Sequence, residues 1–189
     1  MIETEINGVA LSFATAPDLF SPRRVDPGTL ALLSCVRFQP DDKILDLGCG
    51  YGVIGIVAAR LIDPSHVFMV DNDPSAVRVA QDNVARNSVD GVTVAISDGF
   101  DALSERDFSK ILCNPPYHSD FSVAKRFIEK GFNRLIVGGA MWLVTRRETW
   151  YRNKLTGIFG GVRVHKVDEY LVFEAQKRRH SYRKSEKGR

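Results

Sequence analysis

The chain has 189 residues, of which 44% are hydrophobic and 26% are charged, and its net charge at pH 7 is +3. This length suits one domain with a single well-buried core, and the composition is that of an ordinary soluble globular protein. No apolar run is long enough to span a bilayer, and the acidic start of the chain, Met1-Ile2-Glu3-Thr4-Glu5, differs from a signal peptide. We therefore expect a cytoplasmic protein with no membrane segment.

The positive charge is concentrated at the C-terminal end. Residues Lys177–Arg189 hold seven Lys or Arg and one Glu, a net charge of +6, which leaves −3 for Met1–Gln176. We expect one folded domain over residues 1–176 and a basic, disordered tail over residues 177–189. Such a tail either contacts the phosphates of a nucleic acid or is a solvated end that aids solubility, and the sequence leaves both open.

The three cysteines form neither a disulfide pattern nor a metal motif. Cys35, Cys49 and Cys113 are odd in number, lie inside apolar segments and lack the spacing of metal ligands. We expect them to be small buried side chains and expect no metal site.

The first part of the chain predicts a short β segment, a loop and a helix. The apolar residues within 1–12 suit an edge strand or a hairpin. Asp26 can be the N-cap, and Pro27 a first-turn residue, of an apolar helix near Leu30–Val36. Phe20, in the loop between, is either a plug of the core or part of a binding site.

The stretch Asp46–Gly55, D-L-G-C-G-Y-G-V-I-G, predicts a strand, a glycine turn and a helix that runs to about Leu61. Glycines let a cofactor approach the backbone closely. The G-x-G-x-x-G pattern from Gly50 to Gly55 also fits dinucleotide binding, which is a weak signal alone. Asp46 decides between the two, because its carboxylate would repel a pyrophosphate and attract the sulfonium and ammonium groups of S-adenosylmethionine.

Three more strands are predicted at 66–70, 92–96 and 110–113, with helices at 75–87 and 123–132. Polar residues follow each strand, and the carboxyl ends of parallel strands meet at one edge of a sheet. The three groups are Asp71-Asn72-Asp73, Ser97-Asp98-Gly99 and Asn114-Pro115-Pro116-Tyr117-His118. We therefore expect four loops, the glycine turn included, to converge on one crevice.

Asp71 and Asp73 have different expected roles. Asp71 lies at a strand tip 25 residues after Asp46, where an acidic residue can accept hydrogen bonds from both ribose hydroxyls of an adenosine. Asp73 and Pro74 suit the cap and first turn of the next helix.

The last part of the chain has four apolar runs, at 134–137, 141–145, 162–167 and 170–175. Gly138-Gly139 and Gly160-Gly161 punctuate them, and apolar residues near Leu155–Phe159 indicate a last helix. Strands alternating with helices, followed by two adjacent strands, predict a doubly wound α/β sheet with an antiparallel hairpin at one edge.

Three motifs in order resemble the small-domain class I methyltransferases that use S-adenosylmethionine. They are F-x-T-x-P-x-x-F-S with D-x-G-T at Phe13–Thr29, the glycine turn, and N-P-P-Y-H at Asn114–His118. The resemblance covers about residues 8–176 and is closest to the guanine-N2 methyltransferases of small-subunit ribosomal RNA. It implies a Rossmann-like sheet of seven strands in the order 3-2-1-4-5-7-6, with strand 7 antiparallel.

The resemblance also implies site residues. Those expected to bind S-adenosylmethionine are Asp26, Gly28, Thr29, Asp46, Gly48, Cys49, Gly50, Gly52, Asp71, Asn72, Asp98, Gly99 and Asn114. Those expected at the substrate are Phe20, Ser21, Tyr117 and His118. Asp98 would accept from the adenine amine, although an ordinary turn aspartate remains open. His118 would contact RNA or simply cap its loop.

The N-P-P-Y segment resembles the signature of enzymes that methylate planar amino nitrogens: adenine N6, cytosine N4, guanine N2 and glutamine amides. The prolines stiffen the loop and leave backbone carbonyls free. The Asn114 side-chain oxygen and the Pro115 carbonyl can each accept one N–H of the NH2, and they bind harder as positive charge builds on nitrogen. With Tyr117 stacking on the base, the expected catalytic residues are Asn114, Pro115, Pro116 and Tyr117.

We therefore expect RNA as the partner, guanine N2 of small-subunit ribosomal RNA as the target, and a monomer or weak dimer. Some members of the resembling family have an extra N-terminal domain that helps hold RNA. We expect no such domain here, and we expect the basic tail to replace it in part. Two alternatives remain: a release-factor glutamine methyltransferase, which shares N-P-P-Y, and a non-catalytic cofactor- or RNA-binding module. The set Asp46, Asp71 and Asn114 argues against the latter, because an inert scaffold has no chemical need for all three.

Overall fold

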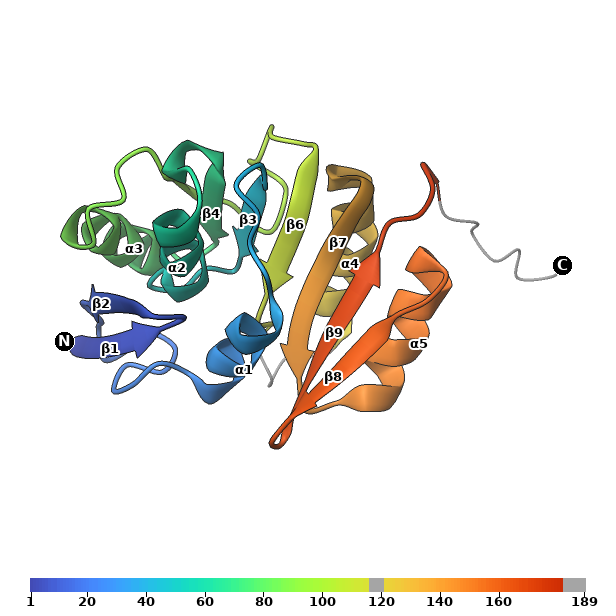
Figure 1. Cartoon of the computed structure of the whole chain (residues 1–189), viewed down its shortest axis with the longest axis horizontal. Helices are drawn as coiled ribbons and strands as arrows, with labels where there is room; N and C mark the ends of the chain where they lie inside the picture. Colours follow the sequence, from blue (N-terminus) through green and yellow to red (C-terminus); the bar gives the residue numbers. More distant parts are fainter. Residues whose placement is uncertain (116–120, 182–189) are drawn as a thin grey trace, which may run out of the picture.

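The computed structural model of the chain describes residues 1–115 and 121–181. The strands of its main sheet are β3 (Ile44–Leu47), β4 (Val67–Asp71), β5 (Thr93–Ile96), β6 (Phe108–Cys113), β7 (Leu135–Thr145), β8 (Arg163–Val167) and β9 (Tyr170–Gln176). They are ordered β5-β4-β3-β6-β7-β9-β8, and β9 alone runs antiparallel to both neighbours (Figure 1). This is the order 3-2-1-4-5-7-6, so the predicted topology is confirmed.

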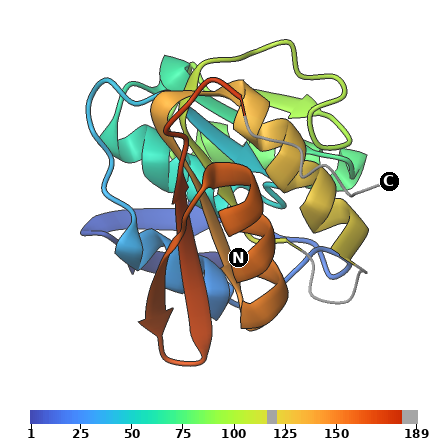
Figure 2. The same cartoon turned by 90° about the vertical axis from the view of Figure 1, so that its right-hand side faces the viewer.

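Helices cover both faces of the sheet (Figure 2). They are α1 (Pro27–Cys35), α2 (Val53–Leu61), α3 (Pro74–Arg86), α4 (Phe121–Arg134) and α5 (Glu148–Phe159), with a short 3-10 helix η1 (Pro64–His66). Apolar residues of α1, α2 and α3 form one core layer, and those of α4 and α5 form the other. Side chains alternate along β3, so Ile44 belongs to the first layer while Leu45 and Leu47 belong to the second. Asp46 therefore faces the same side as Ile44, beneath α2.

Local sequence sets where the helices begin. Asp26 and Asp73 are the N-caps of α1 and α3, each accepting a hydrogen bond from a backbone N–H of its helix, and Pro27 and Pro74 follow them. Both caps are as predicted. Helix α2 instead starts after Gly52, which has a φ of 97° and no side chain to cap the helix. That left-handed conformation requires glycine at the tightest point of the turn.

The N-terminal strands form a separate two-stranded antiparallel sheet of β1 (Ile2–Ile6) and β2 (Val9–Phe13). The hairpin alternative is thus correct, and these strands do not extend the main sheet. Two buried asparagines of α3 and its C-terminal end, Asn83 and Asn87, bind the backbone at the end of this hairpin. The hairpin therefore leads directly into the loop that precedes α1.

The predicted division of residues 134–145 into two runs is wrong. The runs 134–137 and 141–145 form the single strand β7, and Gly138-Gly139 makes an irregularity within it, where the register with β6 shifts. Gly138 has a φ of 94°, and its N–H donates to the Lys177 carbonyl at 2.7 Å. The Lys177 N–H donates to the Gly139 carbonyl at 2.8 Å. The backbone just after β9 thus pairs with the irregular part of β7, so the glycines do not end the strand.

In the part of the chain that the structure describes, no helix has both the length and the apolar character needed to cross a membrane. The same residues contain no group of three or more His, Cys, Asp or Glu side chains arranged to hold a metal ion. Cys35, Cys49 and Cys113 are all free thiols; the last two are buried, as predicted, and the first is partly exposed.

Candidate active site

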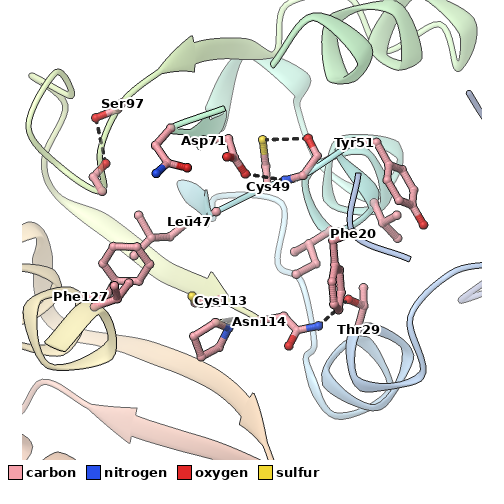
Figure 3. Close-up of a pocket in the computed structure, with 18 of the residues that line it drawn as sticks. Phe20, Thr29, Leu47, Cys49, Tyr51, Asp71, Ser97, Cys113, Asn114 and Phe127 are labelled. Atoms are coloured by element: carbon pink, nitrogen blue, oxygen red, sulfur yellow. Dashed lines mark hydrogen bonds between the residues drawn. The ribbon is translucent and has the colours of Figure 1, made fainter. Parts of the chain in front are cut away.

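A pocket of about 520 Å³ lies at the carboxyl ends of β3 to β6, the edge predicted for the crevice (Figure 3). Predicted site residues in its wall are Phe20, Asp26, Thr29, Gly48, Cys49, Gly50, Asp71, Asn72, Asp98, Gly99, Asn114 and Pro115. Wall residues that the sequence reasoning missed are Leu47, Tyr51, Val53, Ile54, Ser97, Cys113, Val123, Arg126 and Phe127. Those on α4 share a helical spacing of three or four, a signal that could have identified them.

Some predicted residues are not in this wall. Gly28 is buried in the first turn of α1, and Gly52 turns the chain into α2. Ser21 has a φ of 52°, and its hydroxyl donates to the Arg24 carbonyl at 2.7 Å. The predicted residues Pro116, Tyr117 and His118 lie outside the described residues. Phe20, by contrast, is 53% exposed at the pocket, so it does not plug the core.

Asp46 also differs from the expectation of direct cofactor contact. Its side chain is fully buried behind the glycine turn, where one oxygen accepts the Gly55 N–H at 2.9 Å. The other oxygen, Oδ1, has no hydrogen-bond partner among the described residues. Burial raises the pKa of Asp46 to about 7; the Gly55 N–H lowers it and the charge of Asp71 raises it further. Side chains alternate along β3, so the Asp46 side chain points toward α2. There it stabilises the glycine turn through the Gly55 N–H and does not line the pocket.

The N–H groups of the glycine turn are bonded within the protein. Gly48 and Cys49 both donate to the Val70 carbonyl at 2.9 Å, and Gly50 donates to the Asp71 carboxylate at 2.8 Å. In a dinucleotide site, N–H groups at this position bind the pyrophosphate. Here a protein carboxylate already occupies the Gly50 N–H, so the turn does not suit a phosphate group.

The charged side chains in the wall favour a cationic ligand. They are Asp26, Asp71 and Asp98, together with Arg126. Arg126 makes a two-pronged pair with Asp98, one contact being 2.8 Å, and this hydrogen bonding lowers the pKa of the Asp98 carboxyl. The arginine charge is thus matched, and two carboxylates remain. Asp98, expected at the adenine amine, is held in the wall by α4.

Asn114 follows the end of β6 in a fixed orientation. Its side-chain nitrogen donates to the Asp26 carboxylate at 2.8 Å and to the Thr29 hydroxyl at 3.0 Å. Because a carboxylate only accepts hydrogen bonds, the amide nitrogen must face α1. The amide oxygen, Oδ1, is buried and has no hydrogen-bond partner in the described chain. A buried acceptor left unpaired is costly, so this oxygen is suited to an N–H of a ligand.

The sheet order and the crevice at the ends of β3 to β6 are those of the class I methyltransferase fold. Comparison with known families agrees, because residues 10–174 match the methyltransferase small domain. The chain belongs to that family.

Two proteins similar in sequence are named as ribosomal RNA methyltransferases. The chain is 32% identical over 180 residues to ribosomal RNA large subunit methyltransferase G of Pseudomonas putida, covering 91% of this chain and 48% of the relative. It is 32% identical over 176 residues to ribosomal RNA small subunit methyltransferase C of the same organism, covering 90% and 53%. The chain therefore spans about half the length of these relatives.

A solved structure is also similar. It is a T. thermophilus 16S rRNA N2 G1207 methyltransferase in complex with AdoMet and guanosine, with a TM-score of 0.84 and 32% identity. The similarity covers 93% of this chain and 50% of that one. The fold and the family are thus supported by both sequence and structure.

Proposed function

We propose that this chain transfers a methyl group from S-adenosylmethionine to the exocyclic amino nitrogen of a base in ribosomal RNA, namely guanine N2 of the small subunit. The observation that carries the proposal is the Asn114 amide, whose nitrogen is engaged by Asp26 and Thr29 and whose oxygen is unpaired among the described residues. This arrangement leaves an acceptor of Asn114 for the substrate. An NH2 group supplies the matching N–H.

The chemistry explains why an acceptor is needed. The lone pair of an exocyclic NH2 is delocalised into the ring, so the nitrogen is a poor nucleophile. Hydrogen bonds from its two N–H groups to Asn114 Oδ1 and the Pro115 carbonyl favour a pyramidal nitrogen with a localised lone pair. Positive charge then develops on that nitrogen as the bond to the methyl carbon forms and the bond from sulfur to carbon breaks. The acceptors consequently bind the transition state more tightly than the ground state.

The pocket residues fit the two ligands. Asp71, at the tip of β4, is in the wall where a ribose would lie, and carboxylates attract the sulfonium and ammonium groups of the donor. S-adenosylmethionine supplies the activated methyl group when bound. Phe20, half-exposed at the opposite side of the wall from Ser97 in Figure 3, offers an aromatic face to a base. No general base is required, because a methylated amino nitrogen loses its proton readily.

Ribosomal RNA as the substrate is supported by the relatives, which are named for both subunits. The choice of guanine N2 and of the small subunit follows the solved relative, described as a 16S rRNA N2 methyltransferase with guanosine bound. Such a substrate would place the protein with ribosomes in the cytoplasm.

The test is transfer of labelled methyl from S-adenosylmethionine to deproteinised small-subunit RNA, large-subunit RNA and release factor, offered separately. Asn114→Ala protein, purified in parallel, controls for contaminating methyltransferases. We expect label in small-subunit RNA, released as N2-methylguanosine on nuclease digestion. Label in large-subunit RNA alone would correct the subunit, and label in release factor alone would overturn the RNA assignment.

A further inference from the structure

Two asparagines of α3 and its C-terminal end act as a partner for the backbone at the end of β2. The Asn87 side chain accepts the Ser12 N–H at 3.0 Å and donates to the Ser12 carbonyl at 2.8 Å. One helical turn earlier, Asn83 accepts the Ala14 N–H at 2.7 Å and donates to the Ala14 carbonyl at 2.9 Å. Residues 12 and 14 point their backbone groups the same way, as alternate residues of a strand do. The two amides thus replace a missing neighbouring strand.

Asn83 and Asn87 differ in their third hydrogen bond, which Asn87 donates to the Asn83 carbonyl of its own helix at 2.8 Å. The third hydrogen bond of Asn83 runs from its nitrogen to the carbonyl of Tyr51, in the glycine turn, at 2.9 Å. Asn83 is fully buried, so its three hydrogen bonds to Ala14 and Tyr51 are shielded from water. One side chain therefore ties the start of the loop before α1 to the turn that lines the pocket.

Tyr51 continues this link to the far end of the same loop. Its ring meets Phe13 edge-on, with centroids 5.8 Å apart, and its hydroxyl lies 3.5 Å from the Arg24 carbonyl. Tyr51 is itself a wall residue of the pocket. The glycine turn consequently touches the loop at both ends.

The loop between is braced internally. The Thr15 hydroxyl donates to the Pro22 carbonyl at 2.8 Å, and the Ser21 hydroxyl donates to Arg24. Leu19 and Val25 are buried in the core. Burial of Leu19 and Val25 keeps the loop packed on the core but does not fix its exact position, because apolar contacts are non-directional. The directional hydrogen bonds at the two ends of the loop fix its position relative to the glycine turn.

We propose that Asn83 is a positioning residue, which acts through Ala14 and Tyr51 to set the loop of residues 14–25 against the glycine turn. Phe20, within this loop, and the Asp26 N-cap, directly after it, are thereby placed relative to the donor side of the pocket. For its kinetic readout this inference rests on the proposed function. Asn87, which makes the same pair of bonds to β2 without reaching the turn, is the matched control.

The first experiment needs no activity. Arg23 and Arg24 are exposed in the loop, so trypsin cleavage there under native conditions reports how often the loop opens. The full chain is compared as wild type, Asn83→Ala and Asn87→Ala, at a temperature where thermal scans show all three folded. We expect fragments beginning at Arg24 or Val25 to appear about tenfold faster in Asn83→Ala, since the bond to the Tyr51 carbonyl is removed, and within about twofold of wild type in Asn87→Ala, which keeps that bond.

The second experiment uses the methyl-transfer assay. Asn83→Ala should raise the KM for RNA and lower kcat, about tenfold in kcat/KM, while Asn87→Ala keeps both near wild type. Equal effects of the two variants on cleavage and kinetics would overturn the inference, because both would then only dock the hairpin. If the wild type methylates no RNA, the proposed function fails, and the cleavage comparison still decides this inference.

A second variant keeps the inference testable if Asn83→Ala does not fold. Tyr51→Phe keeps the ring against Phe13 and removes only the hydroxyl near Arg24. We expect cleavage at Arg23 and Arg24 to rise about threefold in this variant. Cleavage at the wild-type rate would then overturn the inference.

Discussion

The Asp26 carboxylate and the Asn114 amide are 88 positions apart in the chain and meet at 2.8 Å. The same oxygen of Asp26 caps α1 through the Thr29 N–H at 2.9 Å. One acidic oxygen thus fixes both the start of a helix and the direction of the amide that we propose to act in catalysis. The loop before α1 is therefore part of the proposed active site and not only a cover over it.

Replacing Asp26 by Ser should separate these two tasks. Serine is a good N-cap, so thermal stability should change by less than about 1 kcal/mol, but its side chain is too short to reach Asn114. We expect kcat to fall about tenfold, because the Thr29 hydroxyl alone then holds the amide nitrogen and the amide is oriented less firmly. In Asp26→Asn the amide oxygen can replace the carboxylate oxygen, so the loss should be smaller. Equal losses in both variants would contradict this role of the carboxylate oxygen.

The buried carboxyl of Asp46 should make stability depend on pH. Its pKa is raised from 3.8 to about 7 in the folded protein, so the folded state holds a proton that the unfolded chain has lost. Stability should fall as pH rises from about 4 to 7, by on the order of 4 kcal/mol from this group. Asp46→Asn keeps an acceptor for the Gly55 N–H and should remove that part of the dependence. Urea unfolding of the wild type and of Asp46→Asn at pH 5 and pH 8 measures how the free energy of unfolding changes with pH. The same change in both proteins would contradict this prediction.

The ion pair of Asp42 and Lys110 at the opposite edge of the sheet should stabilise the fold. Burial raises the pKa of Asp42, but hydrogen bonds from Lys110, the Gln39 N–H and Ser109 outweigh it and lower the pKa. Asp42→Ala leaves a largely buried lysine without this partner and should cost about 3 kcal/mol.

The contribution of Asp42 is present above its unfolded pKa of 3.8 and is lost as pH falls below that value. Glu105→Ala, which breaks the more exposed pair with Lys43, is the control and should cost at most about 1 kcal/mol. Chemical denaturation at pH 7 of both variants gives the comparison; equal costs would show that burial of the pair does not matter.

The basic C-terminal segment should contribute to RNA affinity through charge. Lys177 is buried and donates to the Leu135 carbonyl at 2.6 Å, so a truncation should retain it and remove Arg178–Arg189, with six Lys or Arg. The slope of log affinity against log salt should flatten by about 0.7 for each RNA phosphate that the truncated chain no longer neutralises. An unchanged slope would mean that the segment does not bind RNA. Thermal stability of the truncated chain serves as the control.

Much of this fold could be predicted, because the signals were local. The caps at Asp26 and Asp73 and the strand ends at Asp71 and Ile96 depend on neighbouring residues only. The glycines at 138 and 139 misled the prediction, since their irregularity is stabilised by Lys177, which is distant in sequence. A turn and a bulge have the same local signature.

The sequence was enough to predict many of the residues at the site, but not how their side chains contact one another. That Asp46 lies under the turn depends on which face of β3 it takes, and that follows from packing. The bond of Asn114 to Asp26 and the pair of Arg126 with Asp98 join residues far apart in the chain. Such pairs leave no periodic pattern in a single sequence, so only the folded chain reveals them.

The most direct test of the central claim is the single-turnover rate of methyl transfer to ribosomal RNA by Asn114→Ala, with cofactor affinity measured in parallel. The account predicts a rate about 100-fold or more below wild type, because an acceptor that strengthens in the transition state is removed. Affinity for S-adenosylmethionine should stay within about threefold, since that acceptor serves the substrate nitrogen. A variant that transfers methyl at the wild-type rate would contradict the account.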